Sequence, residues 1–264
     1  MNYKEPMICN LHAHTVRCNH ASGTEREYIE NALAGGLKIF GFSDHAPYPF
    51  PAEYRSGFRM RCDQQGDYVD TLLALREEYK GKIDIKIGYE AEYYPKFFGD
   101  FLRMVTEYPI DYLIMGQHFI ENEMEGKYSG ITTDSEAYLA QYADQVIEGI
   151  GTGVFTCVAH PDLCNYTGPR EIFDRHYSRL IEAAMAADMP LEINLLGVRD
   201  HRAYPHDRFF ALCGEMGAEV CIGCDAHQAE VAYDGPSYLK AMEMAEKYGL
   251  RVNAAPALKP VHTL

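Results

Sequence analysis

Histidine and carboxylate side chains recur at short spacings in this sequence. The first group is the pair His12-x-His14, followed by His20, and the last is the pair Asp225-x-His227. Side chains two positions apart on an extended strand point the same way, so both members of such a pair can reach one ion. Imidazole combined with carboxylate suits Zn, Fe or Mn better than Ca or Mg, which prefer oxygen ligands. These spacings therefore indicate a transition-metal site.

Further candidate ligands lie between these two pairs, each near the end of a short apolar run. They are Asp44, His45, Glu90, Glu92, His118, His160 and Asp162. A single histidine at such a position is more often a hydrogen-bonded structural residue than a ligand. Here, however, seven of the eleven histidines share this placement, namely His12, His14, His20, His45, His118, His160 and His227. So many ionisable groups in one place would be unstable without cations, so we expect a multinuclear metal site.

The apolar runs have the length of strands and alternate with longer amphipathic stretches of helical spacing. The predicted strands cover residues 7–11, 38–43, 83–90, 112–117, 155–159, 191–196 and 219–224. The predicted helices cover residues 24–35, 63–80, 95–107, 135–150, 171–188, 206–217 and 236–248. Thr24 and Glu27 form a capping-box pattern at the start of the first helix.

Seven strand–helix alternations predict an α/β fold with a parallel sheet and outer helices. An open doubly wound sheet and a closed barrel both fit this order, and both place sites at the C-terminal ends of strands. In an open sheet, only the strands near the switch point can share one site. Because almost every predicted strand ends in a candidate ligand, we expect a (β/α)7-type barrel, formed by residues 1–264 as a single domain.

The composition restricts the class of protein. The formal net charge is -15, which argues against a nucleic-acid partner. The N-terminal segment, residues 1–15, lacks the pattern of a secretory leader. No apolar stretch approaches the roughly 18 residues of a membrane span, so we expect no membrane partner. The eight cysteines, including the pair Cys221 and Cys224, are then expected to be reduced thiols in a cytoplasmic protein.

Six motifs occur in order along the chain: NLHAHT, FSDHAP, GYEAE, GQHF, AHPDL and GCDAH. They resemble the motifs of the PHP (polymerase and histidinol phosphatase) family, and the resemblance extends from His12 to His227. The segments SDHAPYPF, YKGKIDIKIGYEAEYY and LEINLLGVR are similar to the histidinol-phosphatase branch. The resemblance implies a distorted (β/α)7 barrel with the active site at the C-terminal ends of its strands. It also implies three divalent transition metal ions, which are Zn, Fe or Mn.

The resemblance also implies a ligand set for each ion. By motif position, one ion is held by His12, His14, Glu90 and Asp225. A second ion shares Glu90 and takes His118 and His160. A third takes His20, His45 and His227. Glu90 occupies the Gly-x-Glu position of the family, and Glu92 is a candidate to support a ligand from behind. Asp44 is expected to orient His45, as carboxylates commonly do for ligating imidazoles.

The chemistry expected from such a centre is phosphoester hydrolysis. Ions about 3.5–4 Å apart can bridge a water and generate hydroxide near neutral pH for in-line attack on phosphorus. Asp225, His227 or a metal-bound water could protonate a monoester leaving group. Together with Asp44, the first two are the predicted catalytic residues.

Three residues are candidates to bind the substrate. Arg199 is the preferred phosphate clamp, because a guanidinium can hold two oxygens at once. Asn194, on the sixth predicted strand, is the second. The resemblance leads us to expect an arginine soon after the HPDL motif, but Cys164 and two further uncharged residues stand there. Arg170 lies further along the chain and is the candidate to replace it.

The leading functional hypothesis is hydrolysis of L-histidinol phosphate to L-histidinol and inorganic phosphate, a step of histidine biosynthesis. The second is a PHP phosphoesterase that acts on another small phosphorylated substrate, such as a nucleotide or a phosphodiester. The third is an amidohydrolase-like enzyme that attacks a C–N bond. That family usually bridges its metals with a lysine on the fourth strand, and His118 fits it poorly. The fourth is a non-enzymatic PHP module, which is disfavoured because all nine expected ligands are present.

Overall fold

The computed structural model describes residues 6–264, and it contains one parallel sheet whose strands follow one another in chain order. The strands are β1 (Cys9–Asn10), β2 (Ile39–His45), β3 (Asp84–Ala91), β4 (Tyr112–Met115), β5 (Phe155–Val158), β6 (Leu191–Asn194), β7 (Glu219–Gly223) and β8 (Arg251–Val252). Every neighbouring pair is parallel, and the longest pairing runs from Ile39 opposite Asp84 to His45 opposite Glu90. All strand ends that were expected to carry ligands therefore lie at the same edge of the sheet.

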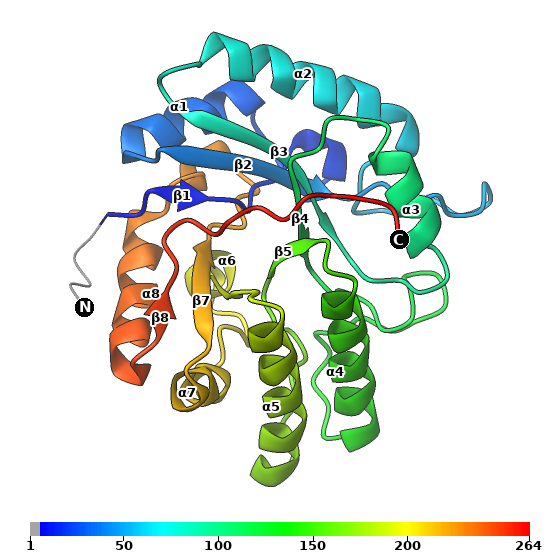
Figure 1. Ribbon diagram of the computed structural model, residues 1–264, viewed down its shortest axis with the longest axis vertical. Coiled ribbons are helices and arrows are strands. Elements are labelled where there is room, and N and C mark those ends of the chain that lie inside the picture. The colour runs from blue at the N-terminus through cyan, green and yellow to red at the C-terminus, as the bar shows by residue number, and fades with distance from the viewer. Residues whose placement is uncertain (1–5) are drawn as a thin grey trace.

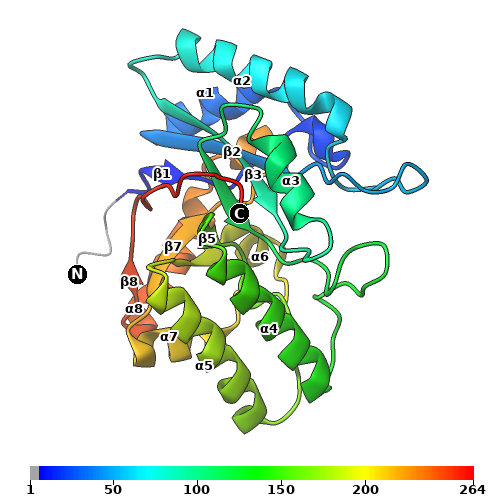
Figure 2. The same ribbon diagram turned by 45° about the vertical axis from the view of Figure 1, so that its right-hand side comes forward.

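Most of the helices lie around the outside of this curved sheet (Figure 1, with a second view in Figure 2). The helices are α1 (Glu25–Gly35), α2 (Gln65–Glu78), α3 (Phe98–Val105), α4 (Glu136–Gly151), α5 (Arg170–Ala186), α6 (Leu195–Asp200), α7 (Asp207–Met216) and α8 (Gly235–Tyr248). The short α6 follows β6 directly. The side chain of Thr24 accepts a hydrogen bond from the backbone N–H of Glu27, and the Glu27 carboxylate accepts one from the backbone N–H of Thr24. The predicted capping box therefore starts α1. Such local signals fix where each helix leaves the sheet.

The sheet closes on itself at its C-terminal end. A parallel bridge joins Ala13 to Ala226, with the N–H of His14 donating to Ala226 O at 2.9 Å and the N–H of Ala226 donating to His12 O at 3.2 Å. On the other side, the N–H of Ser43 donates to Ala13 O at 2.8 Å. The segment after β1 thus lies between the ends of β2 and β7. The first seven strands form the expected distorted (β/α)7 barrel.

Apolar side chains fill the barrel and the layer around it. The interior cluster consists of Cys9, Leu11, Tyr112, Ile114, Cys157, Ala159 and Cys221, and Leu258 of the C-terminal segment packs against it. The C-terminal segment crosses the sheet beyond β8, and the N–H of Lys259 donates to Thr156 Oγ1 at 3.1 Å (Figure 1). The second, larger cluster lies between the sheet and the helices. The barrel is therefore a packed core, and a site can form only at its open, C-terminal mouth.

Two local features differ from the sequence-based expectations. The sixth strand, predicted to reach residue 196, ends at Asn194 because the Asn194 side chain accepts a hydrogen bond from Gly197 N at 3.1 Å and starts α6. An eighth short strand, β8, adds to the outer side of β7. All eight cysteines are free thiols. Within residues 6–264, no helix has the length and apolar character needed to cross a bilayer. Residues 1–5, part of the segment expected to lack a leader, lie outside the described residues.

Candidate metal centre

The nine predicted ligands converge at the C-terminal mouth of the barrel. Glu90 lies on β3, His45 ends β2, and the others follow β1, β4, β5 and β7, namely His12, His14, His20, His118, His160, Asp225 and His227. Two of the predicted ligands stand at backbone positions of positive φ, His160 at 30° just after β5 and Asp225 at 47° just after β7. Such conformations cost energy for residues other than glycine and are concentrated at functional sites.

Glu90 lies at the centre of the cluster and is surrounded by imidazoles. Its Oε1 is 2.8 Å from His160 Nε2 and 3.6 Å from His118 Nε2. Its Oε2 is 3.0 Å from His45 Nδ1 and 3.6 Å from His12 Nε2. A carboxylate whose two oxygens face different imidazoles is suited to bridge two ions.

Asp225 is the second centre of the cluster. Its Oδ1 is 3.1 Å from His14 Nε2, 3.3 Å from His227 Nδ1 and 3.6 Å from His12 Nε2. The ring of His227 also lies 4.5 Å from that of His20, between centroids. Ligand atoms within 4.8 Å of one another occur in several groups, among them His12 with His14 and Glu90, His12 with His160 and Asp225, and His14 with His45 and His227. The geometry therefore offers several adjacent positions for cations.

Hydrogen bonds behind three of the imidazoles fix which ring nitrogen faces the cluster. Glu192 Oε1 is 2.8 Å from His12 Nδ1, and Glu92 Oε1 is 3.0 Å from His118 Nδ1. His20 Nδ1 is 2.8 Å from the carbonyl oxygen of Cys18. Because these oxygens accept, Nδ1 is the donor in each ring, which leaves Nε2 to face the cluster and to bind an ion in the unprotonated ring. This is the pattern by which proteins orient metal-ligating histidines.

Several buried atoms of the cluster make no hydrogen bond within the described chain. They are His12 Nε2, His14 Nδ1, His45 Nδ1, Glu90 Oε2, His160 Nδ1 and His227 Nε2. Buried polar atoms without partners are costly, and so many in one place call for an ion or ordered water. Imidazole nitrogens and carboxylate oxygens are the donors that Zn, Fe and Mn accept, so the residues fit the expected metals.

The charges of the cluster act strongly on one another. Burial raises the pKa of Glu90, but the charges of His118 and His12 outweigh it and hold this pKa well below the ordinary value. Burial lowers the pKa of His14, but the neighbouring carboxylates of Asp225 and Asp44 outweigh burial and raise this pKa to about 9. Metal ions compete with these protons, because a ligating imidazole must be unprotonated.

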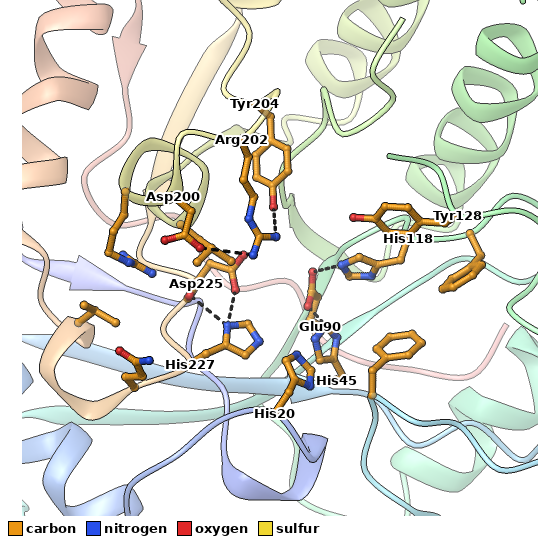
Figure 3. A pocket seen from close by; sticks show the side chains of 16 residues that line it. His20, His45, Glu90, His118, Tyr128, Asp200, Arg202, Tyr204, Asp225 and His227 are labelled. Atoms are coloured by element: carbon orange, nitrogen blue, oxygen red, sulfur yellow. Dashed lines mark hydrogen bonds and ion pairs between the residues drawn. The ribbon is translucent and has the colours of Figure 1, made fainter. Parts of the chain in front are cut away.

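A cavity of about 510 Å³ opens above the cluster (Figure 3). His20, His45, Glu90, His118, Asp225 and His227 line its floor. Its walls are Phe58, Phe119, Tyr128, Leu196, Tyr204 and Val231, together with the polar residues Arg199, Asp200, Arg202 and Gln228. This size suits a small molecule that carries an apolar or aromatic group.

The remaining predicted site residues occupy different places. Asp44 is fully buried, accepts from the backbone N–H of His45 at 2.9 Å and faces the ring of His14, with its Oδ1 3.5 Å from Nδ1. It therefore supports His45 through the backbone, and the ring that it faces is that of His14. Asn194 Nδ2 donates to Glu192 Oε2 at 2.9 Å and to Asp225 Oδ2 at 3.1 Å, below the cavity.

The two predicted arginines also differ in position. Arg199 lines the cavity, but its Nη1 donates to Asp234 Oδ2 at 2.7 Å. Arg170 lies at the start of α5, outside the cavity, where its side chain is 68% exposed and pairs with Asp174. The structure therefore brings Arg199 to the site and leaves Arg170 away from it.

Sequence reasoning missed three buried residues that belong to the site. Glu192, on β6, supports His12 and also accepts from the N–H of His160 at 3.0 Å. Arg59 is bidentate with Glu92, at 3.0 and 3.1 Å, and so anchors the loop after β2 to the carboxylate that holds His118. The thiol of Cys18 lies within 4.8 Å of the ligand atoms of His20 and His227. An inward-facing glutamate in the strand LEIN was the one signal available for Glu192.

Comparisons with known proteins agree with this arrangement. A family profile described as the PHP domain matches residues 10–195. The chain is 29% identical to a probable histidinol-phosphatase of Deinococcus radiodurans, over 84% of this chain and 86% of the relative. It is 24% identical to the histidinol-phosphatase of Bacillus subtilis, over 87% of this chain and 97% of the relative.

Among solved structures, the fold is similar to that of a histidinol phosphate phosphatase from Lactococcus lactis, determined with zinc, L-histidinol and phosphate. The TM-score is 0.73, and the match covers 94% of this chain and 96% of the other at 21% identity. At this level of identity the likeness shows the shared fold.

Proposed function

The chain belongs to the PHP domain family, and on this premise we propose that it is a metal-dependent phosphomonoesterase that hydrolyses L-histidinol phosphate to L-histidinol and inorganic phosphate. The observation that carries the proposal is the cluster around Glu90 and Asp225 at the floor of a cavity of about 510 Å³. The names of the relatives from Deinococcus radiodurans and Bacillus subtilis support the same substrate.

We assign three divalent ions, Zn, Fe or Mn, to the nine ligands His12, His14, His20, His45, Glu90, His118, His160, Asp225 and His227. When bound, these ions supply Lewis-acid stabilisation of the phosphoryl oxygens and a nucleophile at neutral pH. The eight free thiols suit a reducing, cytoplasmic compartment.

The residues of the chain hold the ligating imidazoles in position and can hold the proton that the leaving group requires. Glu192 and Glu92 hold the tautomers in which His12 and His118 present Nε2 to the cluster. Asp44 is buried behind the floor and positions His14 and His45. Asp225 Oδ1 and His227 Nδ1 lie 3.3 Å apart at the cavity, and the proton that the leaving alkoxide requires can be held between them.

A second candidate function is hydrolysis of another small phosphorylated compound at the same centre. It is favoured by Cys164, which is buried and uncharged where the branch was expected to carry an arginine. This substitution affects the recognition of the substrate and leaves the metal ligands unchanged.

A steady-state assay of the metal-reconstituted protein separates these functions. The substrates are L-histidinol phosphate, a panel of nucleotide monophosphates and bis-p-nitrophenyl phosphate. We expect kcat/KM above about 10⁴ M⁻¹s⁻¹ for L-histidinol phosphate and far lower values for the others. Faster hydrolysis of another ester would refute the histidinol phosphate assignment and favour the second candidate.

A further inference from the structure

The sequence lacks the arginine that was expected soon after strand β5, and Arg170, the candidate to replace it, does not line the cavity. Cys164 follows the ligand His160 by four positions, and its side chain is 2% exposed. Arg170 points away from the cavity and pairs with Asp174. The carboxylates of Glu90, Asp200 and Asp225 line the cavity and oppose an anionic substrate, so a positive side chain at the cavity would add to the attraction of the bound ions.

Two arginines line the cavity, and they differ in how their charge is used. Arg199 Nη1 lies 2.7 Å from Asp234 Oδ2, and this aspartate is 8% exposed. Asp234 also accepts from the N–H of Ser237 at 3.0 Å at the start of α8. The charge of Arg199 is therefore compensated by the carboxylate of Asp234, which caps α8.

Arg202 is directed into the cavity by the turn that ends α6. His201 stands in the left-handed region at φ 52°, and the N–H of Arg202 donates to Gly197 O at 3.0 Å. The side chain of Arg202 then reaches the space above Asp225 and Glu90 (Figure 3). Its Nη1 donates to the hydroxyl of Tyr204 at 3.0 Å, and Tyr204 is 5% exposed. The buried tyrosine thus fixes the direction of the guanidinium.

The guanidinium keeps free donors toward the cavity. Its one carboxylate contact within residues 6–264 is with Asp200, at 3.5 Å from Nη2 and between two side chains that are more than 40% exposed. A guanidinium has five N–H donors, and two are used by Tyr204 and Asp200, which leaves three. Burial raises the pKa of Tyr128, and the positive charge of Arg202 acts on the same pKa in the opposite direction. The positive charge of Arg202 therefore acts across the cavity on Tyr128.

We propose that Arg202 binds a phosphoryl oxygen of the substrate and takes the place of the arginine that is absent after β5. This inference rests on the proposed phosphomonoesterase function. The planar fork of Arg202 matches two oxygens of a phosphate, and Tyr204 keeps it in that orientation. The substrate phosphate lies between the metal cluster on the floor and Arg202 above it.

The test measures binding of inorganic phosphate to the metal-loaded protein by calorimetry, together with kcat/KM for the phosphomonoester that the wild-type protein hydrolyses fastest. The variants are Arg202→Gln, Arg202→Lys and Arg199→Gln. The matched control is Arg175→Gln, at an exposed residue of α5 that pairs with Glu136. Metal content and the thermal unfolding midpoint are recorded for each variant, so that loss of the centre or of the fold is detected.

We expect Arg202→Gln to weaken phosphate binding and to lower kcat/KM by about 10- to 100-fold, the range for charge-assisted hydrogen bonds. Arg202→Lys recovers part of the loss, and the metal content stays at the wild-type level. Phosphate binding by Arg202→Gln within twofold of wild type overturns the inference, and so does a comparable loss confined to Arg199→Gln. A wild-type protein that is metal-loaded but neither binds phosphate nor hydrolyses any monoester overturns the proposed function as well.

Discussion

Replacing Glu192 by glutamine tests whether the carboxylate behind His12 sets the affinity for metal. Glu192 accepts three hydrogen bonds, from His12 Nδ1 at 2.8 Å, Asn194 Nδ2 at 2.9 Å and the N–H of His160 at 3.0 Å. Glutamine offers one acceptor oxygen and one NH₂ group. If its oxygen faces His12, the NH₂ group meets the two donors of Asn194 and His160.

The expected magnitude follows from this count. Each buried donor left without an acceptor costs about 1–3 kcal/mol. The loss of negative charge behind His12 also makes its Nε2 a weaker base. Removal of such a supporting partner typically lowers metal affinity by about 10- to 100-fold, and we expect a loss in this range for Glu192→Gln.

The assay is a competition between the protein and a chromophoric chelator for Zn²⁺ at fixed pH. The matched control is Glu77→Gln, because Glu77 has a side chain that is 75% exposed and lies on α2, away from the centre. Circular dichroism of the metal-free proteins checks that both variants fold. If folded Glu192→Gln binds metal as tightly as Glu77→Gln, the carboxylate of Glu192 does not set the metal affinity.

Three further predictions concern stability. Arg59→Met leaves Glu92 and Glu123 buried without their counter-charge and should cost about 3–5 kcal/mol in urea unfolding; a cost no larger than that of exposed Arg61→Ala would argue against a structural role for this network. Burial raises the pKa of Asp162 from 3.8 to about 7, so the stability that its protonated form contributes is fully present below pH 3.8 and is lost as the pH rises through 7. The stability of Asp162→Asn relative to wild type should accordingly increase between pH 5 and 8 in the metal-free protein, and a constant difference would contradict the shift. Zn²⁺ at about 100 times its Kd should stabilise the protein by about 2.7 kcal/mol for each ion bound, and an unfolding midpoint unaffected by chelator would speak against a bound ion.

Much of the fold follows from patterns that are local in sequence. The alternation of apolar runs and amphipathic stretches predicted the parallel α/β class, because each run needs only its own length and period to be recognised. The choice of a closed barrel depended on the candidate ligands at almost every predicted strand end. The end of β6 was misplaced because residues 195 and 196 are leucines and continue the apolar run, although Asn194 caps α6. A helix cap at Asn194 and a longer apolar strand are both compatible with these residues, so the end of β6 could not be predicted from this segment.

The parts of the site that sequence reasoning missed depend on contacts between distant segments. Glu192 and His12 are 180 residues apart, and nothing near either residue marks the pairing. Arg202 was not a candidate from the sequence, because its place at the cavity depends on the left-handed turn at His201. By contrast, the convergence of the candidate ligands was predictable, because parallel strands bring their C-terminal ends to one edge.

The most direct test of the proposed trinuclear centre is the number of transition metal ions bound per chain. The protein is produced in medium supplemented with Zn, Fe and Mn, freed of loosely bound metal by gel filtration, and measured by inductively coupled plasma mass spectrometry against its amino-acid content. We expect three ions per chain, with fewer in a His160→Ala variant that still folds. One ion or none in the folded, reconstituted wild-type protein would contradict the trinuclear centre on which the proposed phosphatase activity depends.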